Sequence, residues 1–355
     1  MIHPASRTIE WMQQVASENS FSNITLIEKS IRAFSLLESL ALSGCPFVFK
    51  GGTALMLHLN SSKRLSIDID IICPPGTNIE DYLRKNAQSY GFSEVKLVER
   101  IGTQNVPKTH AKFFYQVSYV TNSDTECILL DVLFEDIHYK ELVQLPIQSR
   151  FLKLEGEHVL VNVPGTADLL GDKLTAFAPN TTGIPYFKGK KNCSMEIIKQ
   201  LFDIASLFDL TDNLTIVSKT FQKFATVELQ YRELDPENRT QVLDDIYQTA
   251  LCICMKGQSD PENFTLLQNG VRRIQNFIHS EKYTIDSAVV NASKAAYLSV
   301  LIANEISEVT HFDPNNIEPL RNALIESPAL NKLNKLKKTN LEAFFYWNEI
   351  SKIKI

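Results

Sequence analysis

The sequence predicts an α+β fold, in which a mixed sheet flanked by helices is followed by an all-helical C-terminal domain. Strand-like segments recur between residues 45 and 165, and helical spacing of apolar residues dominates from there to the C-terminus. The length of 355 residues also suits two domains better than one small core. We expect helices that pack on the core over residues 1–44, a mixed α/β domain over 45–210 and a helical domain over 211–355.

The expected elements of the first part follow in order along the chain. Apolar residues at helical spacing predict helices over residues 6–44, which Gly44 and Pro46 end. The apolar residues 47–49 predict a buried strand that runs into a glycine turn and a helix over 53–60. The alternating segment SIDIDII predicts a strand over 66–72, since side chains on a strand alternate between its two faces. A helix over 79–90 and strands over 95–101, 112–120, 127–134 and 159–163 complete the sheet region.

The second part is predicted to be helical. The expected helices cover residues 165–177, 194–209, 213–231, 239–256, 263–279, 284–305 and 316–326. The segment 179–192 (PNTTGIPYFKGKKN) is rich in glycine, proline and polar residues, which predicts an exposed loop between two of these helices.

Composition excludes several classes of protein. The formal net charge of −5 does not indicate a nucleic-acid-binding protein, so any contact with a polyanion must come from a local patch. Two candidate patches are residues 188–191 (KGKK) and 332–338 (KLNKLKK). The six cysteines form no C-x-x-C pair, which favours free thiols over a zinc site. Neither a signal peptide nor a run of 18 apolar residues is present, so we expect a cytoplasmic protein without a membrane span.

The chemistry is expected between Lys50 and Asp70. Asp68 and Asp70 are two residues apart on the expected strand, so both carboxylates face one side, close enough to share Mg²⁺ or Mn²⁺. The backbone N–H groups of Gly51, Gly52 and Thr53 open a helix, where partial positive charge favours a phosphate chain. Together these parts are what phosphoryl and nucleotidyl transfer from an NTP requires.

The acid pair also has a purely structural interpretation. A D-x-D segment alone is weak support, because alternating acids are common on exposed strands. Asp68 and Asp70, however, alternate with isoleucines, and a carboxylate beside apolar neighbours is costly unless it is compensated. Either a metal ion or a buried salt bridge to Arg64 would compensate it, and the adjacent glycine turn favours the metal.

At this point the sequence resembles a known family. The string Lys50-Gly51-Gly52-Thr53-Ala54-Leu55, followed by Arg64-Leu65-Ser66-Ile67-Asp68-Ile69-Asp70, is similar to the first motif of the AbiEii/AbiGii toxins. These are nucleotidyltransferases of the DNA-polymerase-β type and the toxins of type IV toxin–antitoxin and abortive-infection (phage-defence) systems. The resemblance extends more loosely to about residue 210. It implies a nucleotidyltransferase domain over 45–210. Ser66 precedes Asp68 on the same strand face, where its hydroxyl would contact the nucleotide, and Arg64 is expected to add a supporting charge there.

The resemblance also implies further site residues. Asp131 lies on an apolar strand similar to the one that carries the family's third carboxylate, where it would bind metal or deprotonate the acceptor hydroxyl. A strand-end acid paired with a lysine is the alternative. Asp136 is a weaker competitor, because it lies beyond the expected strand.

Two helices contribute the remaining implied residues. Asp172-Lys173 resembles the helix-borne lysine motif of the family, and Lys173 would bind the triphosphate, although a solvated lysine is the alternative. The segment from Lys199 to Asp203 resembles the basic residue and K-D-x-x-D helix of the family. Gln200 departs from that pattern because an acid is usual there, and Asp203 fills the functional position if the second aspartate is the one required.

The expected function is nucleotidyl transfer from an NTP to an RNA, with the 3′ end of tRNA as the favoured acceptor and a cognate antitoxin as partner. Transfer to a small molecule such as an amino sugar is one alternative, and it predicts a narrow acidic acceptor pocket. A catalytically inactive nucleotide-binding module is another, and it predicts binding without turnover. The intact pair of Asp68 and Asp70 favours an enzyme, while Gln200 weakly favours the inactive module.

Overall fold

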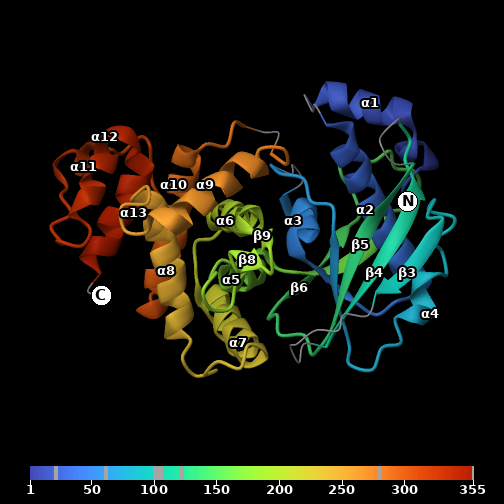
Figure 1. Cartoon of the computed structure of the whole chain (residues 1–355), viewed down its shortest axis with the longest axis horizontal. Helices are drawn as coiled ribbons and strands as arrows, with labels where there is room; N and C mark the ends of the chain where they lie inside the picture. Colours follow the sequence, from blue (N-terminus) through green and yellow to red (C-terminus); the bar gives the residue numbers. More distant parts are fainter. Residues whose placement is uncertain (20–22, 60–62, 99–106, 120–123, 279–280, 354–355) are drawn as a thin grey trace. The chain divides into compact units, whose positions relative to one another are not determined.

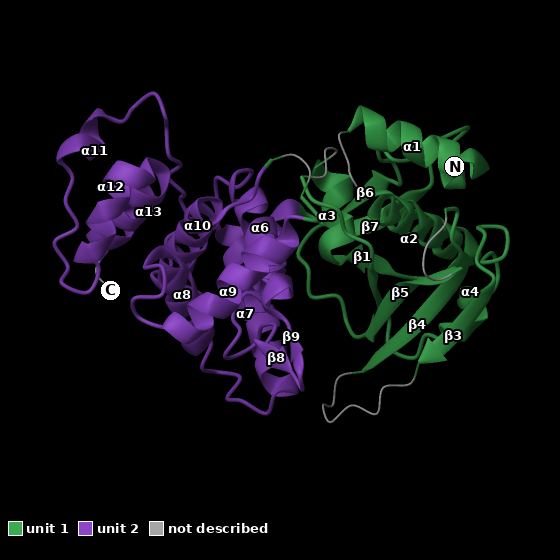
Figure 2. Cartoon of the chain, turned by 45° about the horizontal axis from the view of Figure 1, so that its top comes forward, with its two compact units in different colours: residues 1–165, 276–281 green, residues 166–275, 282–355 purple. Residues whose placement is uncertain are grey.

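The computed structural model describes residues 1–19, 23–59, 63–98, 107–119, 124–278 and 281–353. The chain divides into two compact units, which Figure 2 distinguishes by colour. The first unit contains residues 1–165 and 276–281, and the second contains 166–275 and 282–355. The helices just after residue 165, which fall inside the expected 45–210 domain, are part of the second compact unit. The division at residue 210 therefore stays a prediction about function.

The first unit is built on a five-stranded mixed sheet, which confirms the expected α+β class. Its strands are β1 (Val48–Lys50), β2 (Ile69–Cys73), β3 (Glu94–Val98), β4 (Lys108–Gln116) and β5 (Thr125–Phe134). The order across the sheet is β1-β2-β5-β4-β3, with β2 and β5 parallel and the other pairs antiparallel. Figure 1 shows β3, β4 and β5 side by side. A separate pair, β6 (Leu142–Pro146) and β7 (Leu160–Pro164), lies beyond them in the chain.

Helices pack on this sheet and share the hydrophobic core with its strands. They are η1 (Pro4–Arg7), α1 (Ile9–Glu18), α2 (Ile24–Ser43), α3 (Gly51–Leu59) and α4 (Glu80–Leu83). Helix α2 packs against β2 and β5 (Figure 1) and is buried on nearly all sides, as a helix without a polar face must be. It ends at Gly44, whose φ of 82° is the left-handed conformation that a glycine cap provides. The helical stop predicted at this glycine is confirmed.

Several predicted boundaries of the first unit were wrong. The strand expected over 66–72 begins at Ile69, so Asp68 precedes it in an extended segment. The helix expected over 79–90 ends at Leu83, and turns follow to Gly91, because polar residues interrupt the apolar spacing. β4 begins four residues earlier than expected, at Lys108. The ends expected at residues 60, 99–101, 120 and 279 lie outside the described residues.

In the described part of the second unit, helices and their connecting segments account for the chain apart from one short hairpin. Its elements are α5 (Thr166–Ala176), β8 (Phe187–Lys188), β9 (Lys191–Asn192), α6 (Ser194–Phe208), α7 (Thr215–Tyr231), α8 (Thr240–Cys254), α9 (Pro261–Ile274), α10 (Ile285–Ala303), α11 (Glu318–Asn322), η2 (Asn331–Lys335), α12 (Leu336–Thr339) and α13 (Leu341–Lys352). The expected helices are present with shifts of a few residues. The predicted loop 179–192 contains the β8–β9 hairpin, which the sequence pattern did not reveal.

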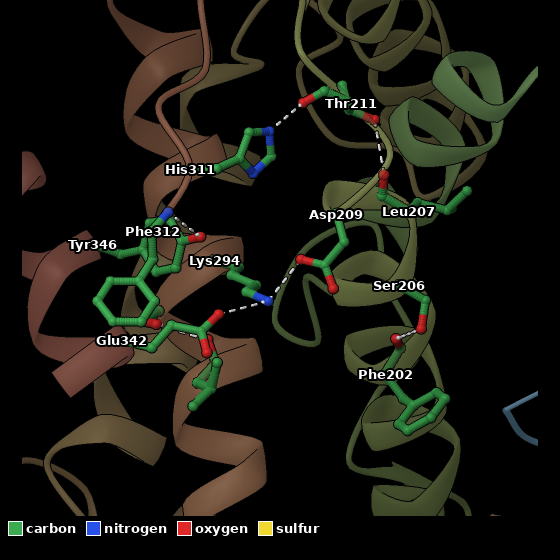
Figure 3. Close-up of polar contacts among 12 residues, drawn as sticks. Phe202, Ser206, Leu207, Asp209, Thr211, Lys294, His311, Phe312, Glu342 and Tyr346 are labelled. Atoms are coloured by element: carbon green, nitrogen blue, oxygen red, sulfur yellow. Dashed lines mark hydrogen bonds and ion pairs between the residues drawn. The ribbon is translucent and has the colours of Figure 1, made fainter. Parts of the chain in front are cut away.

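Helix α10 lies at the centre of this unit, in contact with α6, α8 and α13. Among the described helices it alone is long and apolar enough to cross a membrane, but 72% of its apolar window is buried inside the protein, as in a core helix. Its Lys294 makes ion pairs with Asp209 at 2.7 Å and with Glu342 at 2.9 Å. Figure 3 shows the two carboxylates on opposite sides of the ammonium. Burial lowers the pKa of Lys294, but the two carboxylates outweigh burial and raise it. The ammonium therefore stays charged and joins α10 to α13 and to the end of α6.

All six cysteines are free thiols, as expected. Five are buried, and Cys127 is partly exposed.

Candidate active site

Four polar side chains form one row across the sheet. Asp70 on β2 is the register partner of Lys50 on β1 and of Asp131 on β5. His110 on β4 is in turn the register partner of Asp131. Because register partners share one face of a sheet, the row places a lysine, two carboxylates and an imidazole side by side. The carboxylates of Asp70 and Asp131 repel each other across adjacent strands, and the nearby lysines offset this repulsion only in part.

The row perturbs Asp70 most strongly. Burial is the largest cause, and the neighbouring carboxylates of Asp131 and Asp68 add to it, raising the pKa of Asp70 to about 6. Lys108 and Lys50 oppose the shift with their positive charges. A carboxylate that is costly to ionise and lies near two others is a candidate for a functional group. A bound cation would remove this cost.

Asp131 is held by two residues of β4. Lys108 makes an ion pair with its Oδ2 at 2.9 Å, and the Nδ1 atom of His110 hydrogen-bonds to its Oδ1. Burial would raise the pKa of Asp131, but these two partners outweigh burial and hold it below its usual value. In the described part of the chain, the other ring nitrogen of His110 is buried without a hydrogen-bond partner. The carboxylate is thus ionised and fixed in orientation.

Lys108 and His110 were not predicted as site residues from the sequence. The predicted strand began after both residues, so their alternation onto one face went unseen. The available signal was the alternating K-T-H segment beside a strand with a buried acid that needs a partner. Asp136 is exposed beyond β5, in agreement with its weaker candidacy.

Asp68 reaches the site from the segment that precedes β2. Its side chain is exposed, and its backbone carbonyl accepts a hydrogen bond of 2.6 Å from the Thr53 hydroxyl. The buried Thr53 side chain therefore ties the Asp68 segment to α3 instead of reaching outward to a ligand. The expected proximity of Asp68 and Asp70 is supported by the effect of Asp68 on the pKa of Asp70.

The glycine turn packs directly against these side chains. Gly51 has φ of +81°, and a Cβ atom there would lie 2.2 Å from the Asp70 Oδ2 atom. A Cβ atom at Gly52 would lie 2.8 Å from the Arg64 Nη2 atom and 2.9 Å from the Ser66 Oγ atom. A side chain at Gly51 would require both a left-handed backbone and displacement of the Asp70 carboxylate, whereas one at Gly52 would require the Arg64 and Ser66 side chains to shift. The backbone that opens α3 lies against Asp70, Arg64 and Ser66.

Arg64 and Ser66 frame the turn. Arg64 is buried, and its Nη1 atom donates to the Leu65 carbonyl at 3.0 Å. Ser66 is partly exposed, and its backbone carbonyl accepts from the Ser30 hydroxyl on α2 at 3.2 Å. The structure brings Gly51, Gly52, Thr53, Arg64, Ser66, Asp68, Asp70 and Asp131 together in the first unit.

Lys173 and Asp203 form a buried pair in the second unit. The Lys173 ammonium lies 2.8 Å from the Asp203 Oδ2 atom and 3.1 Å from the Gln200 Oε1 atom. The side chains of Lys173 and Asp203 are only 7% and 1% exposed. Lys173 is therefore not the solvated lysine of the alternative interpretation. Gln200, which departs from the family pattern, is a direct partner of Lys173. Their participation in the site of the first unit stays a prediction.

The carboxylate oxygens of this site are ligand atoms of the kind that a hard divalent cation such as Mg²⁺ binds. In the described part of the chain, no group of three or more His, Cys, Asp or Glu side chains is arranged to hold a metal ion. Mg²⁺ commonly uses only one or two protein carboxylates and takes its other oxygens from substrate phosphates and water. Asp68 and Asp70 would hold the ion. Asp131 as a further ligand stays a prediction, because its two carboxylate oxygens already contact Lys108 and His110.

One comparison with known proteins bears on this arrangement. A family model described as the AbiEii nucleotidyl transferase toxin of type IV toxin–antitoxin systems matches residues 35–269. A crystal structure of a candidate nucleotidyltransferase from H. pylori is similar at 13% identity and a TM-score of 0.40, over 79% of this chain and 96% of that one. That likeness is too weak to carry an argument. None of the curated proteins compared with the chain matches it.

Proposed function

This chain belongs to the AbiEii family of nucleotidyl transferase toxins of type IV toxin–antitoxin systems, and we propose that it moves a nucleotidyl group from an NTP to an RNA. The favoured acceptor is the 3′ end of tRNA, and the reaction needs Mg²⁺ or Mn²⁺. The single observation that carries the proposal is the position of Asp70. Its carboxylate lies against the Gly51 backbone on one side and beside Asp131 on the next strand.

The metal would supply charge neutralisation for the triphosphate and for the entering and leaving oxygens. Asp68 and Asp70 would hold it, in agreement with the raised pKa of Asp70, which a cation would lower. Asp131 is held ionised by Lys108 and His110 and would accept a proton from the acceptor hydroxyl or complete the metal site. The glycine turn at the start of α3 would cradle the phosphates, because its backbone approaches without side chains.

Family membership supports the proposed partner, and the acceptor is a further part of the proposal. An RNA hydroxyl is the proposed nucleophile, and a cognate antitoxin is the proposed protein partner. Transfer to a small amino sugar would be the outcome if RNA stays unlabelled while such compounds become labelled.

The test is label transfer by the purified full chain. Protein, Mg²⁺, each α-labelled NTP and total RNA are incubated, and labelled RNA is separated on a gel. We expect one NTP to label tRNA, and Asp68→Ala to abolish the label. The matched control is Asp124→Ala, which removes an exposed carboxylate just before β5. Label transfer that persists in Asp68→Ala would refute the proposed site.

A further inference from the structure

A basic hairpin in the second unit is not used by the proposed chemistry. It consists of residues 187–192, in which β8 and β9 carry Phe187, Lys188 and Lys191, and Gly189-Lys190 connects them. The three lysines and Phe187 are all exposed. Among the described Phe, Tyr and Trp residues, Phe187 alone is exposed, at 51%. In a chain whose net charge is −5, this is a concentrated and unusual surface.

The hairpin is built as a tight ribbon. The positive φ of Gly189, 59°, followed by a residue without positive φ, is the signature of a two-residue type II′ turn. The register places Lys188 directly opposite Lys191. Like charges directly opposite each other destabilise an antiparallel pair, so this arrangement costs stability without a counter-ion. Lys191 contacts Glu196 at 3.6 Å, whereas Lys188 and Lys190 have no ion-pair partner among the described residues.

The ribbon is nevertheless firmly attached to the unit. The Cys193 N–H donates to the Tyr186 carbonyl at 2.9 Å, which closes the base of the hairpin. The Asn192 side chain accepts from the N–H and hydroxyl of Ser194 at 2.9 and 2.6 Å, where α6 begins. The backbone of the hairpin is thus fixed at the start of α6, the helix that carries Gln200 and Asp203. A preorganised site loses less conformational entropy when it binds.

We propose that the basic hairpin is a contact surface for a single-stranded segment of the RNA acceptor, an inference that rests on the proposed function. Lys188 and Lys191 share one face of the ribbon, and Phe187 lies on the other face. In this arrangement the RNA backbone contacts the lysine face of the hairpin, and an unstacked base of the RNA contacts the Phe187 face. Lysines neutralise phosphates and an exposed aromatic ring stacks on any base, which together define sequence-tolerant single-strand binding.

The second basic patch is a poorer candidate. In residues 332–338, Lys337 donates to the backbone carbonyls of Arg321 and Ala323 and lies over the Phe344 ring. This lysine is committed to packing α12 within the unit. No aromatic side chain among residues 332–338 is available to stack on a base.

The experiment measures binding of a fluorescein-labelled tRNA to the full chain by anisotropy over a range of salt concentrations. We expect the triple variant Lys188→Gln, Lys190→Gln, Lys191→Gln to bind roughly ten- to a hundredfold more weakly at about 0.1 M salt. The slope of log K against log salt is negative, and its magnitude should fall by about 2 to 3, since each phosphate contact contributes about 0.7 to 0.9. Phe187→Ala should weaken binding by about five- to a hundredfold with the slope unchanged.

The matched control carries the same change in charge on the same unit. Lys219→Gln, Lys223→Gln, Lys282→Gln removes three exposed lysines outside the hairpin. Equal loss of binding in this control would show a non-specific charge effect and overturn the inference. Wild-type binding in both hairpin variants would overturn it as well, as would a loss found only in Lys332→Gln, Lys335→Gln, Lys338→Gln.

The same proteins separate this inference from the proposed function. Hairpin variants that bind and label tRNA as the wild type does would remove the inference and leave the function standing. Hairpin-dependent tRNA binding without any label transfer would support the inference and remove the function. A wild-type protein that binds no RNA would remove both.

Discussion

Asp70 on β2 lies directly beside Asp131 on β5, as register partners of the sheet's parallel pair. Their environments push the two pKa values apart: burial raises that of Asp70 to about 6, while Lys108 and His110 keep that of Asp131 low. One carboxylate is therefore costly to ionise and the other is held ionised. Such separation is common where two acids have different tasks.

The first prediction concerns the stability of metal-free protein. Because folding raises the pKa of Asp70 from 3.8 to about 6, the stability that it contributes is complete below pH 3.8 and is lost as the pH rises through 6. Asp70→Asn removes this loss and should stabilise the protein by at most about 3 kcal/mol above pH 6. Denaturant unfolding of the wild type and of Asp70→Asn, with EDTA at pH 4 and pH 7.5, measures this difference in the free energy of unfolding. Equal effects at both values would contradict the prediction.

The second prediction tests whether Asp131 belongs to the metal site. Asp131→Asn should raise the Mg²⁺ concentration at half-maximal label transfer by at least about tenfold, since even a residue that only orients a metal ligand contributes about 10- to 100-fold in metal affinity. Lys108→Met is the comparison, because it removes a partner of Asp131 and leaves the carboxylate in place. A Mg²⁺ midpoint unchanged in Asp131→Asn would limit this residue to proton transfer or to packing.

The third prediction uses two glycines with the same backbone conformation. Gly51→Ala places a Cβ atom 2.2 Å from the Asp70 carboxylate, whereas Gly76, with φ of +83°, has nothing within 4 Å. Both substitutions incur the left-handed cost of about 1–2 kcal/mol. Only Gly51→Ala should also displace Asp70 and reduce label transfer, by at least about a hundredfold. Similar activities of the two variants would show that the close approach has no function.

The local motif was predictable from the sequence, but the arrangement around it was not. Glycines before a helix and acids spaced two apart are short-range patterns, and the glycine turn and the closeness of Asp68 to Asp70 follow from them. The boundary of β2 was misplaced because apolar alternation continues through Ile67, where no partner strand pairs with the backbone.

The row across the sheet depends on strand order, which a single sequence does not specify. Asp70 and Asp131 are 61 positions apart along the chain, and their adjacency requires β2 to pair with β5 in one register. His110 enters the row only because β4 is the next strand. Likewise, the Lys173–Asp203 pair depends on how α5 packs on α6.

The fourth prediction concerns that buried pair. Lys173→Met leaves the Asp203 carboxylate buried without its ammonium partner, and each single substitution should cost about 3–5 kcal/mol. The double variant Lys173→Met, Asp203→Asn should recover much of this loss, because neither charge then stays unpaired. Thermal unfolding of the wild type, the two single variants and the double variant measures stability, and label transfer by the same proteins measures function. If Lys173 binds the triphosphate, stability is rescued while activity is not. Rescue of both would make the pair purely structural.

The last prediction concerns the ion pairs of Lys294, whose side chain is only 8% exposed. Lys294→Ala leaves Asp209 and Glu342 facing each other without a cation. The cost should be about 2–3 kcal/mol, at the low end for buried pairs because both carboxylates are partly exposed. This predicts a fall in Tm of roughly 5–10 °C. Lys256→Ala is the control, since its pair with Asp286 at 3.0 Å is exposed and should cost less than about 1 kcal/mol. Equal losses in the two variants would mean that burial adds nothing to the Lys294 pairs.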